Sequence, residues 1–321
     1  MARSLLALPS GFRDLLFEEA DRRRAAESLL ATEFSKAGYG EIRPSTIEFL
    51  DTYTRGNQSI GERAFKFLDR EDHLLALRAD FTPAVARIVS SRLRTSTGSL
   101  RFWYSGDVFR RPDPKRGDYS EVWQVGAELI GANGLSSDAE VIDLAMRCLE
   151  RLGCSDVRIH LNHANVFRGV IATLQLDDSA RERVKAFIDH KDARGLADQL
   201  RNIGAAPETE HQLQLLARCI GDASVLDVAE GALTQSDAQA AIAHLRALGR
   251  SLARWADRIV YDLTEIDEME YYTGIMFTFL SAKAHRELGN GGRYDSLVRE
   301  FGVDLPAVGF SLAMDAVPGA L

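Results

Sequence analysis

The chain has 321 residues, of which 45% are hydrophobic and 27% are charged, and its formal net charge at pH 7 is −8. This composition is typical of a globular protein and excludes collagen, a disordered acidic segment and a mucin-like stalk. An acidic total offers no general basic surface for a phosphate backbone, although a local basic strip is compatible with it, and we expect no nucleic acid partner.

The spacing of the cysteines and the hydropathy of the chain indicate the cellular compartment of the protein. Cys148, Cys154 and Cys219 form an odd set without CxxC spacing, so we expect reduced, partly buried thiols. No apolar run approaches the ~20 residues that a bilayer requires. The apolar stretch before Pro9 is too short for a signal peptide. The sequence therefore predicts a cytoplasmic protein without a membrane partner.

The first part of the chain alternates between helical and extended patterns. An apolar stripe predicts a first helix that ends at Gly38. Pro44 lacks an amide proton, which favours an edge position for the strand that contains it. The polar segment 112–118 is predicted to be a hairpin loop. The expected elements are a helix at 17–37, a strand at 39–48, a helix at 82–94 and strands at 99–111 and 119–131.

Helical patterning dominates the middle of the chain. Ser137 and Glu140 have the spacing of a capping box and predict the start of a helix. From about 162 to 256 the sequence is polar, helical and rich in Ala, Leu, Arg and Gln. Expected strands flank this region at 157–161, 258–263 and 270–280. This arrangement indicates a helical insertion into a sheet domain.

Side chains on a strand alternate between two faces, which separates the residues of 119–131. Odd positions from Trp123 onward are apolar, whereas the even positions Gln124, Gly126 and Glu128 combine a glycine with polar groups. Taken alone, the even face fits a solvent-exposed face of an antiparallel sheet better than it fits a ligand site. The same combination recurs at Tyr104, Gly106 and Arg110, and at Glu268, Glu270, Tyr272 and Gly274. Three such strands together predict a polar floor for a small ligand.

Other candidate sites are weaker. His160 and His163 lie near a strand end, but the sequence shows no further His, Cys or carboxylate beside them, so we predict structural roles and no metal. Residues 290–295 fit either a hairpin turn entering a helix or a ligand-binding loop. The sequence contains no P-loop, no GxGxxG after a strand and no GxSxG elbow, and we expect no cofactor.

Several segments, in order, resemble the class II aminoacyl-tRNA synthetases in their histidyl form. They cover an N-terminal segment (9–16), motif 1 (38–44), motif 2 (102–111 and 123–131), two histidine signatures (270–274 and 291–295) and motif 3 (306–310). The resemblance implies an α+β fold, with an antiparallel sheet flanked by helices. It also implies one synthetase-like domain over 1–321, with a helical insertion at about 162–256.

The resemblance implies a nearly intact histidine site. A carboxylate at Glu128 is suited to accept a hydrogen bond from an imidazole N–H, and a tyrosine can serve the second nitrogen. The positions that match the family's histidine contacts are Asp80, Thr82, Arg110, Gln124, Glu128, Tyr271, Tyr272 and Tyr294.

The ATP side of the same site is degenerate. The changed positions are Pro112, Asp118, Val122, Asp267 and Ala316, which replace a glutamate, an arginine, an aromatic residue and two further arginines of the family. One lost charge contact at close range corresponds to roughly 4 kcal/mol at a surface-like dielectric. Losing several is expected to abolish adenylation. The chain also stops at Leu321, directly after motif 3, so we expect no anticodon-binding domain.

A histidyl-synthetase-like chain of this kind most resembles the regulatory subunits of ATP phosphoribosyltransferase. The resemblance implies a non-catalytic subunit that joins a short catalytic subunit, forms a homodimer through the motif 1 region and binds L-histidine as feedback inhibitor. One alternative is a truncated synthetase paralogue that makes an aminoacyl-adenylate for a non-tRNA acceptor. Another is a histidine-binding module attached to a different partner.

Overall fold

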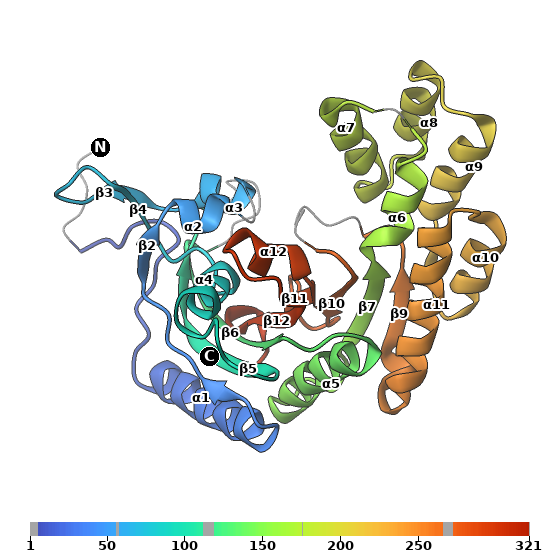
Figure 1. The fold of residues 1–321 in the computed structure, drawn as a ribbon. Coiled ribbons are helices and arrows are strands. Elements are labelled where there is room, and N and C mark those ends of the chain that lie inside the picture. Colours follow the sequence, from blue (N-terminus) through green and yellow to red (C-terminus); the bar gives the residue numbers. More distant parts are fainter. Residues whose placement is uncertain (1–5, 56–57, 112–118, 175, 266–271, 321) are drawn as a thin grey trace.

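The computed structural model describes residues 6–55, 58–111, 119–174, 176–265 and 272–320 (Figure 1). The main sheet consists of β1 (Gly40–Glu41), β5 (Leu100–Phe109), β6 (Glu121–Ile130), β7 (Arg158–His163), β8 (Ile220–Gly221), β9 (Ile259–Asp262), β10 (Ile275–Leu280), β11 (Gly289–Arg293) and β12 (Ala307–Ala313). Their order is β1-β5-β6-β12-β11-β10-β7-β9-β8. Neighbours are antiparallel except for the parallel pairs β1–β5 and β7–β9. The expected antiparallel sheet is therefore confirmed at its centre, with parallel pairs toward its two ends.

Helices cover both faces of this sheet. The helices are α1 (Glu18–Lys36), α2 (Asp51–Thr54), α3 (Gln58–Arg63), α4 (Thr82–Arg92), α5 (Leu135–Arg151), α6 (Ala164–Ile171), α7 (Asp178–Asp189), α8 (Ala193–Asn202), α9 (Pro207–Leu216), α10 (Ser224–Ala232), α11 (Ser236–Ser251) and α12 (Asp295–Glu300), with short 3₁₀ turns at Ala253–Arg258 and Met314–Ala316. One apolar core joins α1, α5 and the helices after β7, and a second joins α4 and α12 to the opposite face. Among the residues described, none of the helices combines the length and apolar character needed to cross a membrane.

A second, smaller sheet lies beside the first. It has the order β2-β4-β3, formed by β2 (Ile47–Phe49), β3 (Lys66–Leu68) and β4 (Leu74–Leu77). In Figure 1 this sheet and the helices α6 to α11 lie at opposite ends of the molecule.

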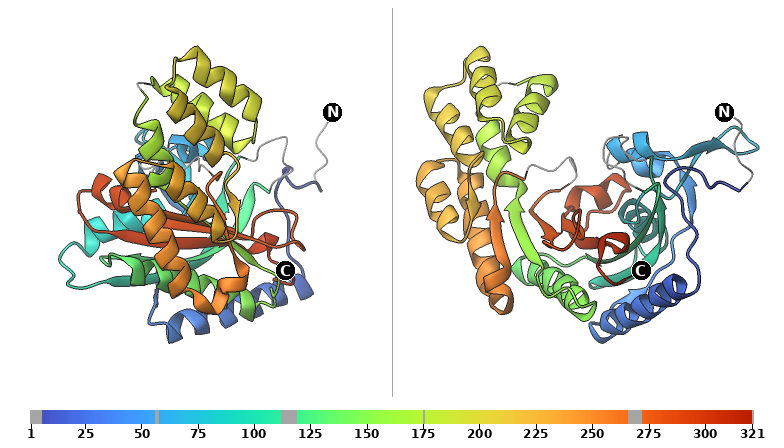
Figure 2. Two further views of the ribbon diagram at one scale, coloured as in Figure 1. Left: turned by 90° about the vertical axis from the view of Figure 1, so that its right-hand side faces the viewer. Right: turned by 180° about the vertical axis from the view of Figure 1, so that it is seen from behind.

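The helices α6 to α11 occupy the connection between β7 and β9, which are parallel neighbours. Parallel neighbours require a crossover connection, and here the crossover has grown into a group of helices. Figure 2 shows these helices standing as an arm at one end of the sheet.

Both faces of β6 are buried. The odd positions, including Trp123 and Leu129, belong to the core formed with α1 and α5, as the alternation predicts. On the even face, Gln124 is 6% exposed and Glu128 is 1% exposed. The interpretation of that face as a solvent-exposed one is therefore wrong, and its polar groups are enclosed by α4, α12 and neighbouring strands.

The expected strand at 39–48 is wrong as a single element. Its first part forms β1 in the main sheet, and its last part begins β2 in the small sheet. Pro44 lies between them, and its carbonyl accepts a hydrogen bond of 3.0 Å from Nη1 of the buried Arg78. The proline interrupts the ladder and a distant arginine fixes the bend, which local periodicity does not reveal.

The capping-box prediction is also wrong. Helix α5 begins at Leu135 with Gly134 at the N-cap, and Ser137 donates to the Gly134 carbonyl at 2.7 Å. Glu140 is used elsewhere, because its carboxylate accepts from Arg101 Nε at 2.8 Å and from Tyr39 OH at 3.0 Å. Glu140 therefore forms an ion pair with Arg101 of β5 and does not cap its own helix.

An ion pair inside the protein ties the sheet to α5 and α11. Arg293 donates to the fully buried Asp138 at 2.6 Å and 3.0 Å and to Ser137 Oγ at 2.9 Å. The other oxygen of Asp138 lies 2.9 Å from Nε2 of His244 on α11. One carboxylate thus joins β11, α5 and α11.

We predict that Arg293→Ala lowers the free energy of unfolding by about 3–5 kcal/mol, because it leaves the Asp138 carboxylate buried without its cation. The matched control is Arg299→Ala, which removes an ion pair to Asp304 from an arginine that is 63% exposed. We expect the control to cost less than about 1 kcal/mol. Urea unfolding of both variants measures the difference, and equal midpoints would contradict the prediction.

Candidate functional site

A small pocket lies on the face of the sheet that carries the even positions of β6, and its empty space of about 260 Å³ includes the part that is open to solvent. Its floor comes from β6, β11 and β12, and its walls come from the start of α4 and the residues that flank β10 and β11. The lining residues are Asp80, Thr82, Glu128, Tyr272, Asn290, Gly291, Tyr294, Gly309, Phe310 and Ser311.

Glu128 is the centre of the hydrogen bonding in this pocket. Its Oε1 accepts from Thr82 Oγ1 at 2.9 Å and from the hydroxyl of Tyr104 at 3.1 Å. Its Oε2 accepts from the hydroxyl of Tyr294. These three donors come from α4, β5 and the start of α12, so one side chain organises groups that are far apart in the sequence.

The electrostatic state of Glu128 follows from its burial. Burial raises the pKa of Glu128 to about 8, while the hydrogen bonds from Tyr294 and Thr82 lower it and the nearby Asp80 charge raises it. Burial also raises the pKa of Tyr104 well above its ordinary value. The phenol therefore remains a hydrogen-bond donor to the carboxylate.

Two glycines make room for this arrangement. Gly309 of β12 lies opposite Glu128 in the register, and a Cβ at Gly309 would overlap the Glu128 carboxylate. Gly126 lies opposite Tyr104, and a Cβ there would meet the phenol ring. Both positions therefore require glycine because polar side chains from neighbouring strands lie across their backbone.

A second carboxylate, that of Asp80, lines the pocket. Asp80 is buried and accepts from the backbone N–H of Thr82 at 3.3 Å. Arg110 lies 3.5 Å from Asp80 and donates from Nε to the carbonyl of Ala79 at 2.5 Å. Two acidic side chains with phenols and a threonine hydroxyl suit a small ligand that carries N–H groups or a positive charge.

The structure brings together most of the residues that the sequence singled out for histidine. Asp80, Thr82, Glu128, Tyr272 and Tyr294 line the pocket. Arg110 and Gln124 are not lining residues, and Tyr271 lies outside the described residues. The side-chain Oε1 of Gln124 is buried, and within the described residues it has no hydrogen-bond partner.

Sequence reasoning missed several residues of the pocket. Phe310 and Ser311 line it without having been assigned to it, whereas Asn290 lies in the segment 290–295 that the sequence marked as a possible ligand-binding loop. Tyr104 belongs to the predicted polar floor, but its hydrogen bond to Glu128 was not predicted. Ser311 shares a strand face with Gly309, so the alternation along 307–313 carried a usable signal. The hydrogen bond between Tyr104 and Glu128 could not be predicted in this way, because it depends on the strand register.

The positions of the degenerate ATP side are only partly described. Val122 lies on β6 opposite Val108 and packs against the core beneath α4. Ala316 lies in the last 3₁₀ turn and packs against the core beneath α1 and α5. Neither is a lining residue of the pocket, and Pro112, Asp118 and Asp267 lie outside the described residues.

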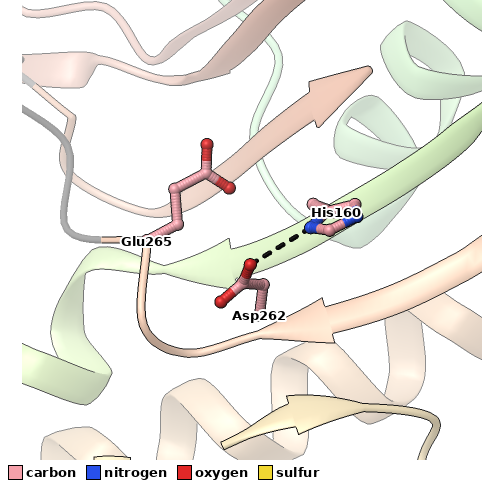
Figure 3. Close-up of side chains that lie close together, drawn as sticks. All are labelled: His160, Asp262 and Glu265. Atoms are coloured by element: carbon pink, nitrogen blue, oxygen red, sulfur yellow. Dashed lines mark hydrogen bonds and ion pairs between the residues drawn. The ribbon is translucent and has the colours of Figure 1, made fainter. Parts of the chain in front are cut away.

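The two histidines of β7 have different surroundings. His160 has two carboxylates nearby, Asp262 and Glu265, which corrects the expectation that it has none (Figure 3). His163 caps α6 by accepting from the N–H of Asn165 at 3.2 Å, and burial lowers its pKa to about 4. His163 thus has the structural role that the sequence predicts, whereas His160 belongs to a cluster with the donor types of a metal site.

Nearly the whole chain is similar to known proteins of one family. The family model for histidyl-tRNA synthetase matches residues 11–317. An ATP phosphoribosyltransferase regulatory subunit of Moorella thermoacetica is 36% identical over 98% of this chain and 82% of the relative. Its counterpart in Clostridium acetobutylicum is 31% identical over 98% and 78%. A crystal structure described as an ATP phosphoribosyltransferase regulatory subunit/histidyl-tRNA synthetase from Bacillus halodurans has a TM-score of 0.91 at 27% identity and covers 100% of this chain and 84% of that one.

We predict that Glu128 makes the protein less stable as the pH rises. Between the ordinary glutamate pKa of about 4.3 and its folded value of about 8, the folded chain holds a proton that the unfolded chain lacks. The contribution of Glu128 to the free energy of unfolding therefore falls through this window, by at most about 1.4 kcal/mol per pH unit.

Urea unfolding between pH 5 and 8 checks this on the wild type and on Glu128→Gln. The difference between the two should change with pH, and the matched control Glu62→Gln, an exposed residue of α3, should show no such change. A pH-independent difference for Glu128→Gln would refute the assignment.

Proposed function

The chain belongs to the family of ATP phosphoribosyltransferase regulatory subunits, which share the histidyl-tRNA synthetase fold, and from this premise we propose that it senses L-histidine. In this proposal, histidine occupies the pocket around Glu128 and conveys feedback inhibition to a separate, short catalytic subunit. The chain itself carries out no aminoacylation.

The observation that supports this proposal most directly is the buried carboxylate of Glu128 between two tyrosines. A carboxylate accepts from an imidazole N–H, and the hydroxyl of Tyr294 or Tyr272 can serve the second nitrogen of the ring. Asp80, which also lines the pocket, is suited to an ammonium group, because an ionised acceptor forms a stronger hydrogen bond than a neutral one. Histidine carries both of these groups.

The degenerate ATP side argues against adenylate formation. Val122 cannot stack on an adenine as an aromatic residue does, and Ala316 offers no charge to a phosphate. Each close charge contact that is lost corresponds to roughly 4 kcal/mol at a surface-like dielectric. The alternative of an adenylate-forming paralogue therefore lacks a supporting feature in the described part of the chain, and ATP–pyrophosphate exchange would detect it.

Feedback requires that histidine bind one state of the assembled complex more tightly than another. A coupling free energy of about 1–3 kcal/mol is sufficient for regulation. The regulatory chain needs no chemistry of its own for this role. A pocket that binds histidine without consuming ATP meets the requirement.

We also propose that the chain forms a homodimer through the small sheet next to motif 1. One face of that sheet carries the aligned apolar residues Ile47, Phe49, Phe67, Leu75 and Leu77. Ile47 is 46% exposed and Phe49 is 56% exposed, so the described part of the single chain leaves this face open to solvent. An exposed row of this kind marks an interaction surface, and the motif 1 resemblance points to a second copy as its occupant.

Histidine calorimetry tests the sensor proposal. We expect micromolar-range binding to the wild type and at least tenfold weaker binding to Glu128→Gln, because the neutral amide loses a charge-assisted hydrogen bond worth about 1.5–3 kcal/mol. Glu121→Gln is the matched control on the same strand, since its side chain lies on the opposite face of β6. This control should bind like the wild type.

The same variants are then assayed in complex with a short ATP phosphoribosyltransferase. Histidine should inhibit the complex that contains the wild type or Glu121→Gln, and Glu128→Gln should require at least tenfold more histidine. Equal inhibition of all three complexes would contradict a regulatory site in this pocket.

Sedimentation velocity tests the homodimer. We predict that Phe49→Asp gives a monomer where the wild type gives a dimer, because the substitution places a charge in the apolar face. Val228→Asp is the matched control, since Val228 is 54% exposed on α10, at the other end of the molecule. A dimer that survives Phe49→Asp would exclude this face as the interface.

A further inference from the structure

The cluster of His160, Asp262 and Glu265 lies where the parallel strands β7 and β9 meet the turn that follows β9. His160 belongs to β7, Asp262 is the last residue of β9, and Glu265 follows three residues later. One donor atom from each of the three side chains lies within 4.8 Å of the other two. Figure 3 shows the three side chains gathered beside the end of β9.

The donor types and spacing match those of a divalent transition metal site. Zinc is bound by histidine nitrogen and carboxylate oxygen at about 2.0–2.2 Å, which places neighbouring ligand atoms of a tetrahedral site about 3.3–3.6 Å apart. His160 Nδ1 and Asp262 Oδ2 are 3.1 Å apart. A carboxylate oxygen of Glu265 is near the same centre, because the three donor atoms all lie within 4.8 Å of one another.

Hydrogen bonds from neighbouring residues hold both carboxylates. Asp262 Oδ1 accepts from the backbone N–H of Thr264 at 3.1 Å and from its hydroxyl at 2.5 Å, which leaves Oδ2 directed at His160. Glu265 accepts from the hydroxyl of Thr278 on β10. Outer hydrogen bonds of this kind orient the ligands in protein metal sites.

The cluster faces the same side of the sheet as the pocket. Residues that are paired across neighbouring strands share a face, and His160 pairs with Thr278, which pairs with Asn290 of β11. Asn290 lines the pocket. The cluster therefore lies two strands from the pocket on a continuous polar face of the sheet.

We propose that His160, Asp262 and Glu265 bind one divalent transition metal of the zinc type, with water completing the coordination. The ion takes the place between His160 and Asp262 that their hydrogen bond now occupies, and its charge removes the repulsion between the two carboxylates. It fastens the end of β9 and the residues that follow it as far as Glu265 onto β7. This proposal does not depend on histidine binding.

Calorimetric titration of the chelator-treated chain with Zn²⁺ tests the site. We expect one ion per chain at this site, with affinity at least tenfold weaker in both His160→Gln and Asp262→Asn. The matched control is His73→Gln, which removes another histidine whose Nδ1 lies 3.0 Å from a carboxylate, that of Asp69, but on the exposed surface. The control should keep the wild-type affinity.

Cobalt substitution provides a second readout that does not depend on the folding of a variant. Co²⁺ in the wild type should give the visible absorption of a four- or five-coordinate ion with nitrogen and oxygen ligands, and Zn²⁺ should displace it. The octahedral spectrum of a surface-bound ion, or Zn²⁺ affinity unchanged in both variants, would overturn the proposal. The cluster would then be a hydrogen-bonded tie between β7 and β9.

Discussion

The buried side chain of Glu128 constrains the positions of the helices and strands that supply its hydrogen-bond partners. Glu128 lies on an interior strand of the sheet and is almost completely removed from water, so its oxygens require hydrogen-bond partners inside the protein. The donors Thr82, Tyr104 and Tyr294 satisfy this requirement. They fix the start of α4, the register of β5 against β6, and the start of α12. The fold and the pocket are therefore parts of the same arrangement.

The residue before Tyr294 extends this arrangement to the other face of the sheet. Tyr294 contacts Glu128 in the pocket, while Arg293 contacts Asp138 beneath the sheet. Asp138 in turn meets His244 of α11, within the helices that connect β7 to β9. Two successive residues thus join the pocket to the helical arm through an unbroken series of polar contacts. A ligand that competes for the hydroxyl of Tyr294 acts beside an ion pair that anchors this arm.

The sequence predicts those features that depend on local periodicity. Alternation along 119–131 is sufficient to separate the core face of β6 from the pocket face, and the apolar stripe at 17–37 identifies α1. Features that depend on long-range contacts do not follow in this way. The break of the strand at Pro44 involves Arg78, and the true partners of Glu140 are Arg101 and Tyr39. The carboxylates beside His160 are about a hundred residues away in the chain, so no local pattern could reveal them.

The ionisation of Glu128 explains why such a pocket is suited to sensing. With a pKa of about 8, Glu128 in the empty pocket is mainly the protonated acid at neutral pH, and the carboxylate lies only about 1.4 kcal/mol higher in free energy. A ligand that offers an N–H or a positive charge to Glu128 favours the carboxylate, and part of its binding free energy is used to release the proton. The affinity is thereby reduced, and selectivity for a donor-bearing ligand arises because a ligand without such a group does not stabilise the carboxylate form. In the proposed sensor, moderate affinity lets the ligand leave when its concentration falls, and the carboxylate form of Glu128 still discriminates against molecules of similar size that carry no donor.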